Sequence, residues 1–267
     1  MSVGSMSRGG PYQSGRTTIS SQSCNSVLQH RYDAAMSTTQ RRAPDTDGRR
    51  TAAAARRRAR EAEIIAATRA LFDERGVRDA QIDDIARAVG INRAIVYRHF
   101  SGKEELFALT LVGYLDELRE ELAAAVPGAE NARDRLAAMV AAFADYGVAH
   151  PAFVDCAQAL MRRSGPELLD EISESALFRL GRAISACLTL LTGVLQEGAA
   201  AGELHVDDPV LLANTLYASG LGALQLARVG ILVREESPGV PTVGRISPDQ
   251  VRDFLVTTAL ALAGRPG

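Results

Sequence analysis

A pair of short helical patterns joined by a glycine, within residues 81–100, constrains the fold more than any other feature of the sequence. Residues 82–89 place isoleucine, alanine and valine on one helix face, and Gly90 ends that pattern. Asn92 is a suitable N-cap for a second helix that runs to Phe100. The segment therefore predicts a helix-turn-helix, a motif whose second helix enters the DNA major groove. Two short helices also occur in many all-α cores, so the pattern by itself leaves both interpretations open.

Longer helical patterns flank this segment. Residues 64–72 carry their apolar side chains on one face, and Gly76 is placed to end that helix. Lys103 begins a long pattern that continues through Leu118 towards Pro127. The sequence therefore predicts a three-helix unit that leads into a long helix.

The remainder of the chain predicts further helices and no strands. Pro151 restarts the chain at a first helical position, and the apolar patterns cover residues 132–150, 167–198, 210–229 and 248–263. Residues 235–248 are rich in proline and glycine and predict a loop. The apolar residues that we expect on the buried side of the last helix are Val251, Phe254, Leu255 and Leu260. The fold class is therefore expected to be all-α.

Charge is distributed unevenly along the 267 residues. Eleven arginines against three aspartates give residues 1–60 a net charge of +8, which leaves −10 for the rest of a chain whose total is −2. Residues 1–55 also hold few apolar side chains, so we expect a disordered basic extension there. Its arginines could reach the phosphates or the minor groove of DNA, or they could be merely solvated, and both interpretations remain open.

Composition and spacing disfavour several other classes of protein. The three cysteines form no CxxC pair, which fits a reducing compartment, and no membrane-length apolar run or secretory signal is present. We therefore expect a cytoplasmic protein with no membrane partner. The chain lacks a nucleophile motif, a glycine-rich phosphate loop and metal-ligand spacing, so we expect no enzyme activity, no catalytic residue, no cofactor and no metal. The residues considered for these roles are Cys24, Cys156, Cys187, His30, His99, His150 and His205.

The three-helix unit resembles the N-terminal DNA-binding domain of the TetR family of bacterial one-component regulators. The similarity covers about fifty residues without gaps. It is carried by Leu71-Phe72, Gly76, Ile82-Asp83-Asp84-Ile85-Ala86, Val89-Gly90-Ile91, Val96-Tyr97-Arg98-His99-Phe100 and Lys103-Glu104-Glu105-Leu106. The resemblance implies a helix-turn-helix DNA-binding domain at residues 56–106 and a helical ligand-binding and dimerisation domain at residues 107–267.

The second helix of the motif carries the candidate base-reading residues. Arg93, Ala94, Tyr97 and Arg98 are expected to cluster on one side, with Val96 pointing into the core. Arginine can contact guanine through two hydrogen bonds, and a small alanine lets the helix approach and touch a thymine methyl group. We therefore expect Arg93 and Ala94 to meet bases.

Phosphate contacts are expected on both sides of that helix. The resemblance implies such contacts for Tyr97, His99 and Lys103, although the first two could instead pack and cap helices. Asn92 joins this candidate set from the N-cap position. Gln81 stands where the family usually has threonine or serine, and because glutamine caps poorly, its phosphate contact stays open.

The resemblance also implies a ligand pocket between the later helices, without giving its position here. The candidate lining residues are Phe143, Tyr146, Phe153, Cys156, Met161, Phe178, Cys187 and Tyr217. Apolar residues on such helices belong to plain core more often than to a pocket wall. The small number of polar groups suggests a largely apolar effector.

Small residues in the apolar segment 210–229 permit close helix approach, which favours a homodimer built on this helix. The combined prediction is a ligand-responsive transcriptional repressor that binds pseudo-palindromic operator DNA as a homodimer and is released by a small effector. The alternative is an architectural or activating DNA-binding protein without a small-molecule ligand.

Overall fold

The computed structural model describes residues 47–264 and divides the chain into two units, residues 1–53 and 54–267. Residues 1–46, which hold most of the predicted extension, lie outside the described part. Helix α2 (Asp47–Arg75) begins before residue 55, so residues 47–55 are helical rather than part of a disordered extension. The run of alanines at residues 52–55 explains this difference, because alanine has the lowest helix-propensity cost.

The helix-turn-helix is present as predicted. It consists of α3 (Ile82–Val89) and α4 (Arg93–His99), and the long α5 (Lys103–Ala125) follows. Gly90 ends α3 in the left-handed conformation at φ +69°, which glycine adopts without steric cost. The Asn92 side chain caps α4 by accepting a hydrogen bond from the backbone nitrogen of Ala94 at 2.9 Å.

A compact apolar core holds these helices together. Val96 and Phe100 are 1% and 2% exposed, which confirms that they face inward. Phe72 of α2 meets Phe107 of α5 edge to face, with 4.9 Å between ring centroids. These contacts hold α4 against α2 and α5. The side of α4 that faces away from this core stays exposed.

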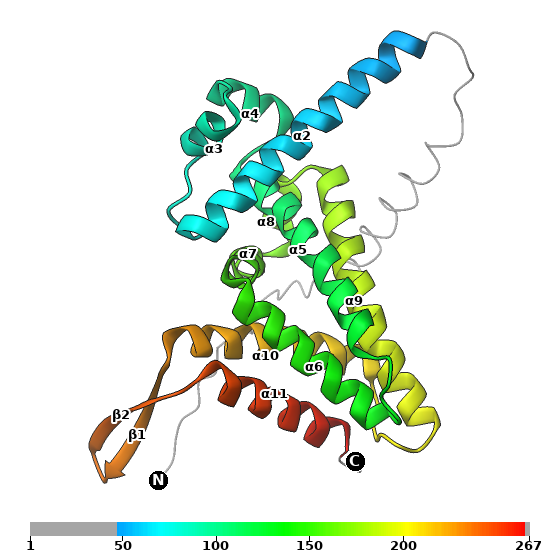
Figure 1. Cartoon of the computed structure of the whole chain (residues 1–267), viewed down its shortest axis with the longest axis vertical. Helices are drawn as coiled ribbons and strands as arrows, with labels where there is room; N and C mark the ends of the chain where they lie inside the picture. The colour runs from blue at the N-terminus through cyan, green and yellow to red at the C-terminus, as the bar shows by residue number, and fades with distance from the viewer. Residues whose placement is uncertain (1–46, 265–267) are drawn as a thin grey trace, which may run out of the picture. The chain divides into compact units, whose positions relative to one another are not determined.

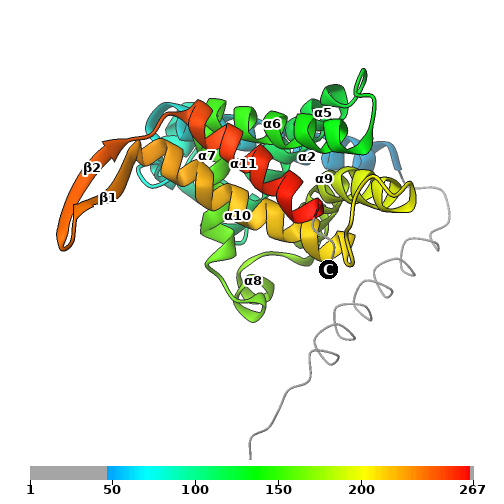
Figure 2. The same ribbon diagram turned by 90° about the horizontal axis from the view of Figure 1, so that it is seen from below.

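The later helices confirm the all-α class (Figure 1). They are α6 (Ala132–Ala149), α7 (Pro151–Met161), α8 (Gly165–Glu171), α9 (Glu174–Ala200), α10 (Pro209–Val229) and α11 (Pro248–Ala263). The predicted restart at Pro151 is confirmed, and the chain bends by 98° between α6 and α7 there. α5 packs against α6 and α9, and α10 lies among α6, α9 and α11, an arrangement visible from below in Figure 2.

Residues 167–198 are mostly helical, as predicted, with one interruption where α8 ends at Glu171 and Ser173 caps α9 by accepting a hydrogen bond from the Ala176 nitrogen. Two expectations for the later segments are wrong. Phe254 does not face the core of α11, since its side chain is 68% exposed. The predicted loop at residues 235–248 contains part of a β-hairpin.

The hairpin pairs β1 (Ile231–Ser237) with β2 (Val240–Arg245) in antiparallel register, with Val233 opposite Val243. Pro238 and Gly239 form its turn, and Gly239 adopts φ +79°. Both views show the hairpin projecting beyond the ends of α10 and α11 (Figures 1 and 2). The sequence pattern missed it because prolines and glycines interrupt the alternation of so short a pair of strands.

α9 and α10 are long and apolar enough to cross a membrane by length and composition, which corrects the expectation that no such segment exists. Both helices instead pack in the bundle described above. Only 22% and 28% of their apolar windows are buried within the chain. The residues of these two windows that are not buried form a surface that another molecule could cover.

Candidate functional site

One face of α4 is free of the core and carries the predicted base-reading residues. Arg93, Ala94, Tyr97 and Arg98 are all exposed, whereas Val96 on the opposite side is buried. The helix therefore presents two cations, an aromatic ring and a small side chain to an outside partner.

The Arg93 side chain is held in place by contacts with Tyr97 and Asp83. Its Nη2 donates to the Tyr97 hydroxyl at 3.1 Å, and its guanidinium lies 5.4 Å from the centre of the Tyr97 ring. Its Nη1 lies 3.4 Å from the Asp83 carboxylate of α3. The Tyr97 hydrogen bond and the nearby Asp83 charge raise the pKa of Arg93, so this cation stays charged at every relevant pH.

The remaining predicted DNA contacts are distributed around α4. Gln81 makes no capping hydrogen bond to α3, as its poor capping chemistry predicts. His99 is largely buried, with Nδ1 3.5 Å from Glu61 of α2, so packing already engages this ring. The Lys103 ammonium lies 5.0 Å from the Phe107 ring centre at the start of α5.

The basic stretch of α2 is exposed but partly neutralised. Arg57 pairs with Glu61 at 2.9 Å, and Arg60 pairs with Glu63 at 2.8 Å. Arg56 and Arg58 are also exposed on the same helix. Surface pairs of this kind contribute little to stability, so these arginines can exchange a carboxylate for a phosphate at small cost.

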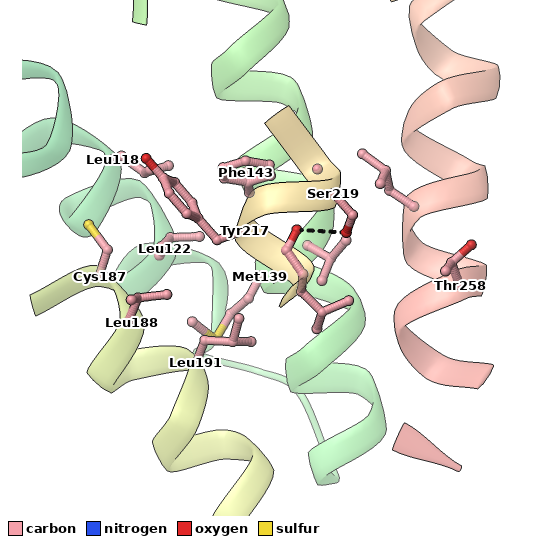
Figure 3. Close-up of a pocket in the computed structure, with 14 residues that line it drawn as sticks. Leu118, Leu122, Met139, Phe143, Cys187, Leu188, Leu191, Tyr217, Ser219 and Thr258 are labelled. Carbon is pink, nitrogen blue, oxygen red and sulfur yellow. Dashed lines mark hydrogen bonds between the residues drawn. The ribbon is translucent and has the colours of Figure 1, made fainter. Parts of the chain in front are cut away.

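A small apolar cavity of about 60 Å³ lies between α5, α6, α9, α10 and α11 (Figure 3). It is lined by Leu118, Leu122, Met139, Val140, Phe143, Cys187, Leu188, Leu191, Leu216, Tyr217, Ser219, Gly220, Leu255 and Thr258. None of these residues carries a charge. The volume suffices for a few water-sized groups and is well below the several hundred Å³ of typical ligand pockets.

Few polar atoms reach this cavity. The Cys187 thiol donates to the Leu115 carbonyl at 3.2 Å, and burial raises the pKa of this thiol to about 11. The Ser219 hydroxyl donates to the Thr215 carbonyl at 2.7 Å and lies 3.3 Å from the Leu216 carbonyl, the contact that Figure 3 marks. Burial also raises the pKa of Tyr217. Tyr217 therefore brings a neutral hydroxyl group to the lining of the cavity.

The predicted ligand residues fall into three groups. Phe143, Cys187 and Tyr217 line the cavity, Tyr146, Phe153 and Cys156 are buried elsewhere in the core, and Met161 and Phe178 are 54% and 39% exposed. Periodicity could have found most of the missed lining residues, because Leu118 and Leu122, or Met139 and Phe143, stand one helical turn apart. It could not separate them from other core residues with the same spacing.

Aromatic contacts lead from the cavity towards α5 and α2. Phe143 contacts Tyr217 and Phe153, with ring centroids 6.1 and 6.3 Å apart, and Phe153 lies 5.5 Å from Tyr146. The Tyr146 hydroxyl donates to Glu117 of α5 at 3.2 Å. Glu117 in turn binds Arg69 of α2 through both carboxylate oxygens.

Charge pairing reinforces this junction. The hydrogen bond from Arg69 lowers the pKa of Glu117, and the same bond raises the pKa of Arg69. The Arg69 guanidinium also lies 4.3 Å from the centre of the Tyr114 ring, whose hydroxyl donates to Asp73 at 2.6 Å. α2 is therefore held against α5 by a continuous set of polar contacts.

A second junction lies where α4 gives way to α5. Glu105 is 6% exposed and accepts hydrogen bonds from the backbone of Ser101 at 2.8 Å and from the Ser173 hydroxyl at 2.6 Å. Burial alone would raise the pKa of Glu105, but the hydrogen bonds from Ser101 and Ser173 lower it below its ordinary value. Arg163 adds ion pairs to Glu104 at 3.0 Å and Glu171 at 2.8 Å.

No group of three or more histidine, cysteine, aspartate or glutamate side chains suited to a metal ion occurs within residues 47–264. The two cysteines of this range, Cys156 and Cys187, are buried and form no disulfide.

Comparison with known sequences finds similarity over the segment that includes α3 and α4. Residues 64–109 match the sequence model of the bacterial regulatory proteins of the tetR family. The transcriptional activator FasR of Mycolicibacterium smegmatis is 33% identical over 87 residues, which cover 33% of this chain and 40% of FasR. The transcriptional repressor KstR2 of Rhodococcus jostii is 27% identical over 154 residues, which cover 58% of this chain and 72% of KstR2. The chain thus spans less than half of FasR.

Comparison with solved structures extends the fold over the later helices. The structure of RolR in complex with resorcinol superimposes with a TM-score of 0.57 at 16% identity, covering 79% of this chain and 90% of RolR. At this identity the likeness establishes the arrangement of the helices and nothing about the ligand of this chain.

Proposed function

We propose that this chain is a ligand-responsive transcriptional regulator of the TetR family that represses its target genes, and the family match over residues 64–109, which include its helix-turn-helix, supports this proposal. It binds a pseudo-palindromic operator as a homodimer, and a small effector releases it. The exposed Arg93–Tyr97 pair on α4 is the observation that carries DNA binding. The longer similarity to KstR2, which extends beyond the DNA-binding unit, favours repression over the activation named for FasR.

In the proposed complex α4 lies in the major groove. Arg93 reads a guanine edge, and Ala94 permits close approach to a thymine methyl group. Arg98 lies on the same exposed face, and Tyr97 and Lys103 hold phosphates beside it, with Lys103 at the helix N-terminus, where backbone N–H groups favour anions. Asn92, Gln81 and His99 set the position of α4 more than they touch DNA, since Asn92 caps the helix and His99 packs against Glu61.

The proposed effector is small, uncharged and mostly hydrocarbon, with one hydrogen-bond acceptor. The absence of charged lining residues supports an uncharged molecule, since a buried unpaired charge is costly. The neutral Tyr217 hydroxyl can donate a hydrogen bond, which supports an oxygen acceptor on the ligand. The resorcinol bound by the structural neighbour RolR is likewise small and uncharged.

Effector entry is proposed to act by shifting a population of conformations. A cavity of about 60 Å³ must widen to hold such a molecule, and widening displaces Phe143 and Tyr217. The aromatic contacts pass this displacement to Tyr146 and Glu117, and so to Arg69 on α2. The favoured dimer then holds its two α4 helices at a spacing that no longer matches successive major grooves.

The exposed apolar side chains of α10 and α11 support the homodimer. Val210, Leu211 and Val229 of α10 are 55–63% exposed, and Phe254 of α11 is 68% exposed. A second copy that pairs α10 and α11 with their equivalents would cover these residues in a four-helix interface. The protein is proposed to act in the cytoplasm, where operator DNA is accessible, without enzyme activity or a cofactor.

Fluorescence anisotropy with DNA from upstream of the gene tests the regulator at two salt concentrations. We expect specific binding that weakens steeply with salt, since each phosphate contact releases counterions. Arg93→Ala with Tyr97→Ala should lower the affinity about a hundredfold or more, at roughly 1–3 kcal/mol for each lost contact. Arg75→Ala, at the far end of α2, is the control that should leave binding unchanged. Equal affinity of the double variant, in a folded dimer, contradicts the proposal.

A ligand screen on the same assay separates the regulator from the architectural alternative. Small uncharged molecules should release the wild-type protein from DNA, and Tyr217→Phe should weaken this response about fivefold, as expected for one hydrogen bond. If a broad set of such molecules leaves operator affinity unchanged, the architectural interpretation replaces this one.

A further inference from the structure

The β-hairpin between α10 and α11 carries exposed apolar side chains on one face, between the charged residues Arg245 and Glu235. Val233 and Val243 are paired across the strands and are 77% and 71% exposed. Ile231, on the same face as Val233, is 47% exposed. An isolated two-stranded hairpin is marginally stable in water, so contact with another surface would stabilise this one.

An apolar groove of about 170 Å³ lies at the base of the hairpin. It is lined by Gly147, Val148, Pro151, Val154, Leu224, Gln225, Ala227, Arg228 and Pro248. Val148 is 39% exposed there. The hairpin of the same chain does not fill this groove, because its valines remain exposed.

The groove also holds an unsatisfied polar atom. Oε1 of Gln225 is buried and has no hydrogen-bond partner in the described residues. Arg228 beside it is already occupied, since it donates to Asp155 at 2.6 Å. A buried acceptor without a donor is unfavourable, so an occupant with free N–H groups would be favoured.

The edge of a β-hairpin offers such free N–H donors. Each strand of a two-stranded sheet leaves one row of backbone N–H and C=O groups unpaired, and such edges readily bind other chains. The hairpin therefore offers apolar side chains for the groove walls and N–H donors for Gln225.

The exposed apolar surface of α10 continues into the hairpin, which favours a second copy of this chain as the partner. Leu226 and Val229 near the end of α10 are 38% and 59% exposed and lead directly to Ile231 of β1. A copy that covers the exposed face of α10 therefore meets the hairpin at its base. In a two-fold interface each hairpin faces the other subunit, and the contact occurs twice.

We propose that the hairpin is a dimerisation arm, whose Val233–Val243 face enters the groove beside Gln225 on the second subunit. This inference rests on the homodimer of the proposed function and adds to it a contact outside the four-helix interface.

Sedimentation equilibrium of the full chain tests the arm. Val233→Asp with Val243→Asp should raise the dimer dissociation constant about a hundredfold, at tenfold for each of two equivalent arms. Val233→Thr with Val243→Thr keeps the β-branched shape and should give a smaller rise in the same direction. Thr242→Asp, opposite Arg234 on the other face of the hairpin, is the matched control and should leave the dimer intact.

The outcomes separate the arm from the dimer itself. A dimer that both valine variants leave as tight as wild type overturns the arm and leaves the proposed function standing. A wild-type chain that is monomeric at all concentrations overturns both. Operator binding measured well above the raised dissociation constant should survive in the valine variants, because α4 is untouched.

Cross-linking provides a second, positional test. A Val233→Cys chain mixed with a Val148→Cys chain should form an intermolecular disulfide between these two positions, as located by peptide mapping. Thr242→Cys mixed with Val148→Cys should not. Equal cross-linking in both mixtures overturns the proposed docking of the valine face.

Discussion

The α4 face and the cavity between α5 and α10 carry the two halves of the proposed function by opposite chemistry. The α4 face displays charged and aromatic side chains that packing does not require. The cavity is lined by leucines and other apolar residues that packing requires everywhere in the core. A site made of exposed polar residues is therefore visible as a departure from the apolar pattern, whereas a site made of core residues is part of that pattern.

The largest effect is expected from filling the cavity. A Cβ atom added at Gly220 would lie 2.6 Å from Cε1 of Phe143, so Gly220→Ala must push the ring. We expect effector response to fall at least tenfold and stability to fall by roughly 1–2 kcal/mol, while operator binding without effector persists. Thermal denaturation and ligand-dependent anisotropy measure the two effects.

Gly113→Ala is the control for that substitution. Gly113 lies inside α5, and a Cβ atom there would meet nothing within 4 Å. Because alanine is the better helix former, this variant should be more stable by up to about 1 kcal/mol with an unchanged effector response. If both glycine variants lose the response equally, the cavity is not the effector site.

The next effect concerns the link between the two regions. Glu117→Gln keeps the shape of the side chain but removes the charge that binds Arg69 through both oxygens. We expect the effector-induced change in operator affinity to shrink by a factor of about five, while each ligand still binds alone. Anisotropy titrations with and without effector give this factor, and the exposed Glu120→Gln on the same helix should not alter it. An undiminished factor would show that coupling avoids Arg69.

A smaller, pH-dependent effect is expected at Glu105. Hydrogen bonds from Ser101 and Ser173 outweigh burial and hold its pKa below the ordinary value of 4.5, so the charged form stabilises the fold. This contribution is complete above pH ~5 and is lost as the pH falls through the lowered pKa. Melting temperatures of wild type and Glu105→Gln should therefore differ at pH 7, by the equivalent of about 1 kcal/mol, and converge in acid. A constant difference at all pH values would contradict this assignment.

The smallest effect is expected at Gln81, whose extended backbone suits an N-cap that its side chain does not supply. Gln81→Thr should stabilise the chain by roughly 0.5–1 kcal/mol and leave operator specificity unchanged. Chemical denaturation detects the gain, and Gln81→Ala should show none. A threonine variant no more stable than the alanine variant would mean that another group already satisfies the first turn of α3.

Features that depend on local chemistry could be predicted from the sequence, and features that depend on packing between distant residues could not. Gly90 and Asn92 act through local chemistry, so the boundaries of α3 and α4 were predictable. The interruption at Ile172 depends on burial of that side chain against distant residues, and the hairpin depends on pairing across a turn, so neither was predicted. Residues at the right spacing could be placed on a helix face, but only the assembled bundle separates Phe143 at the cavity from Phe153 behind it.

The narrowness of the cavity also has a consequence for the speed of induction. In the proposed mechanism the cavity must widen to hold a molecule larger than a few water-sized groups, so association would include an opening step. Association that requires a conformational change falls below the usual range of about 10⁵–10⁷ M⁻¹s⁻¹. The same opening must recur before the effector leaves, so the cell would retain the induced state after the effector concentration falls. The regulator would then act as a delay element as well as a sensor.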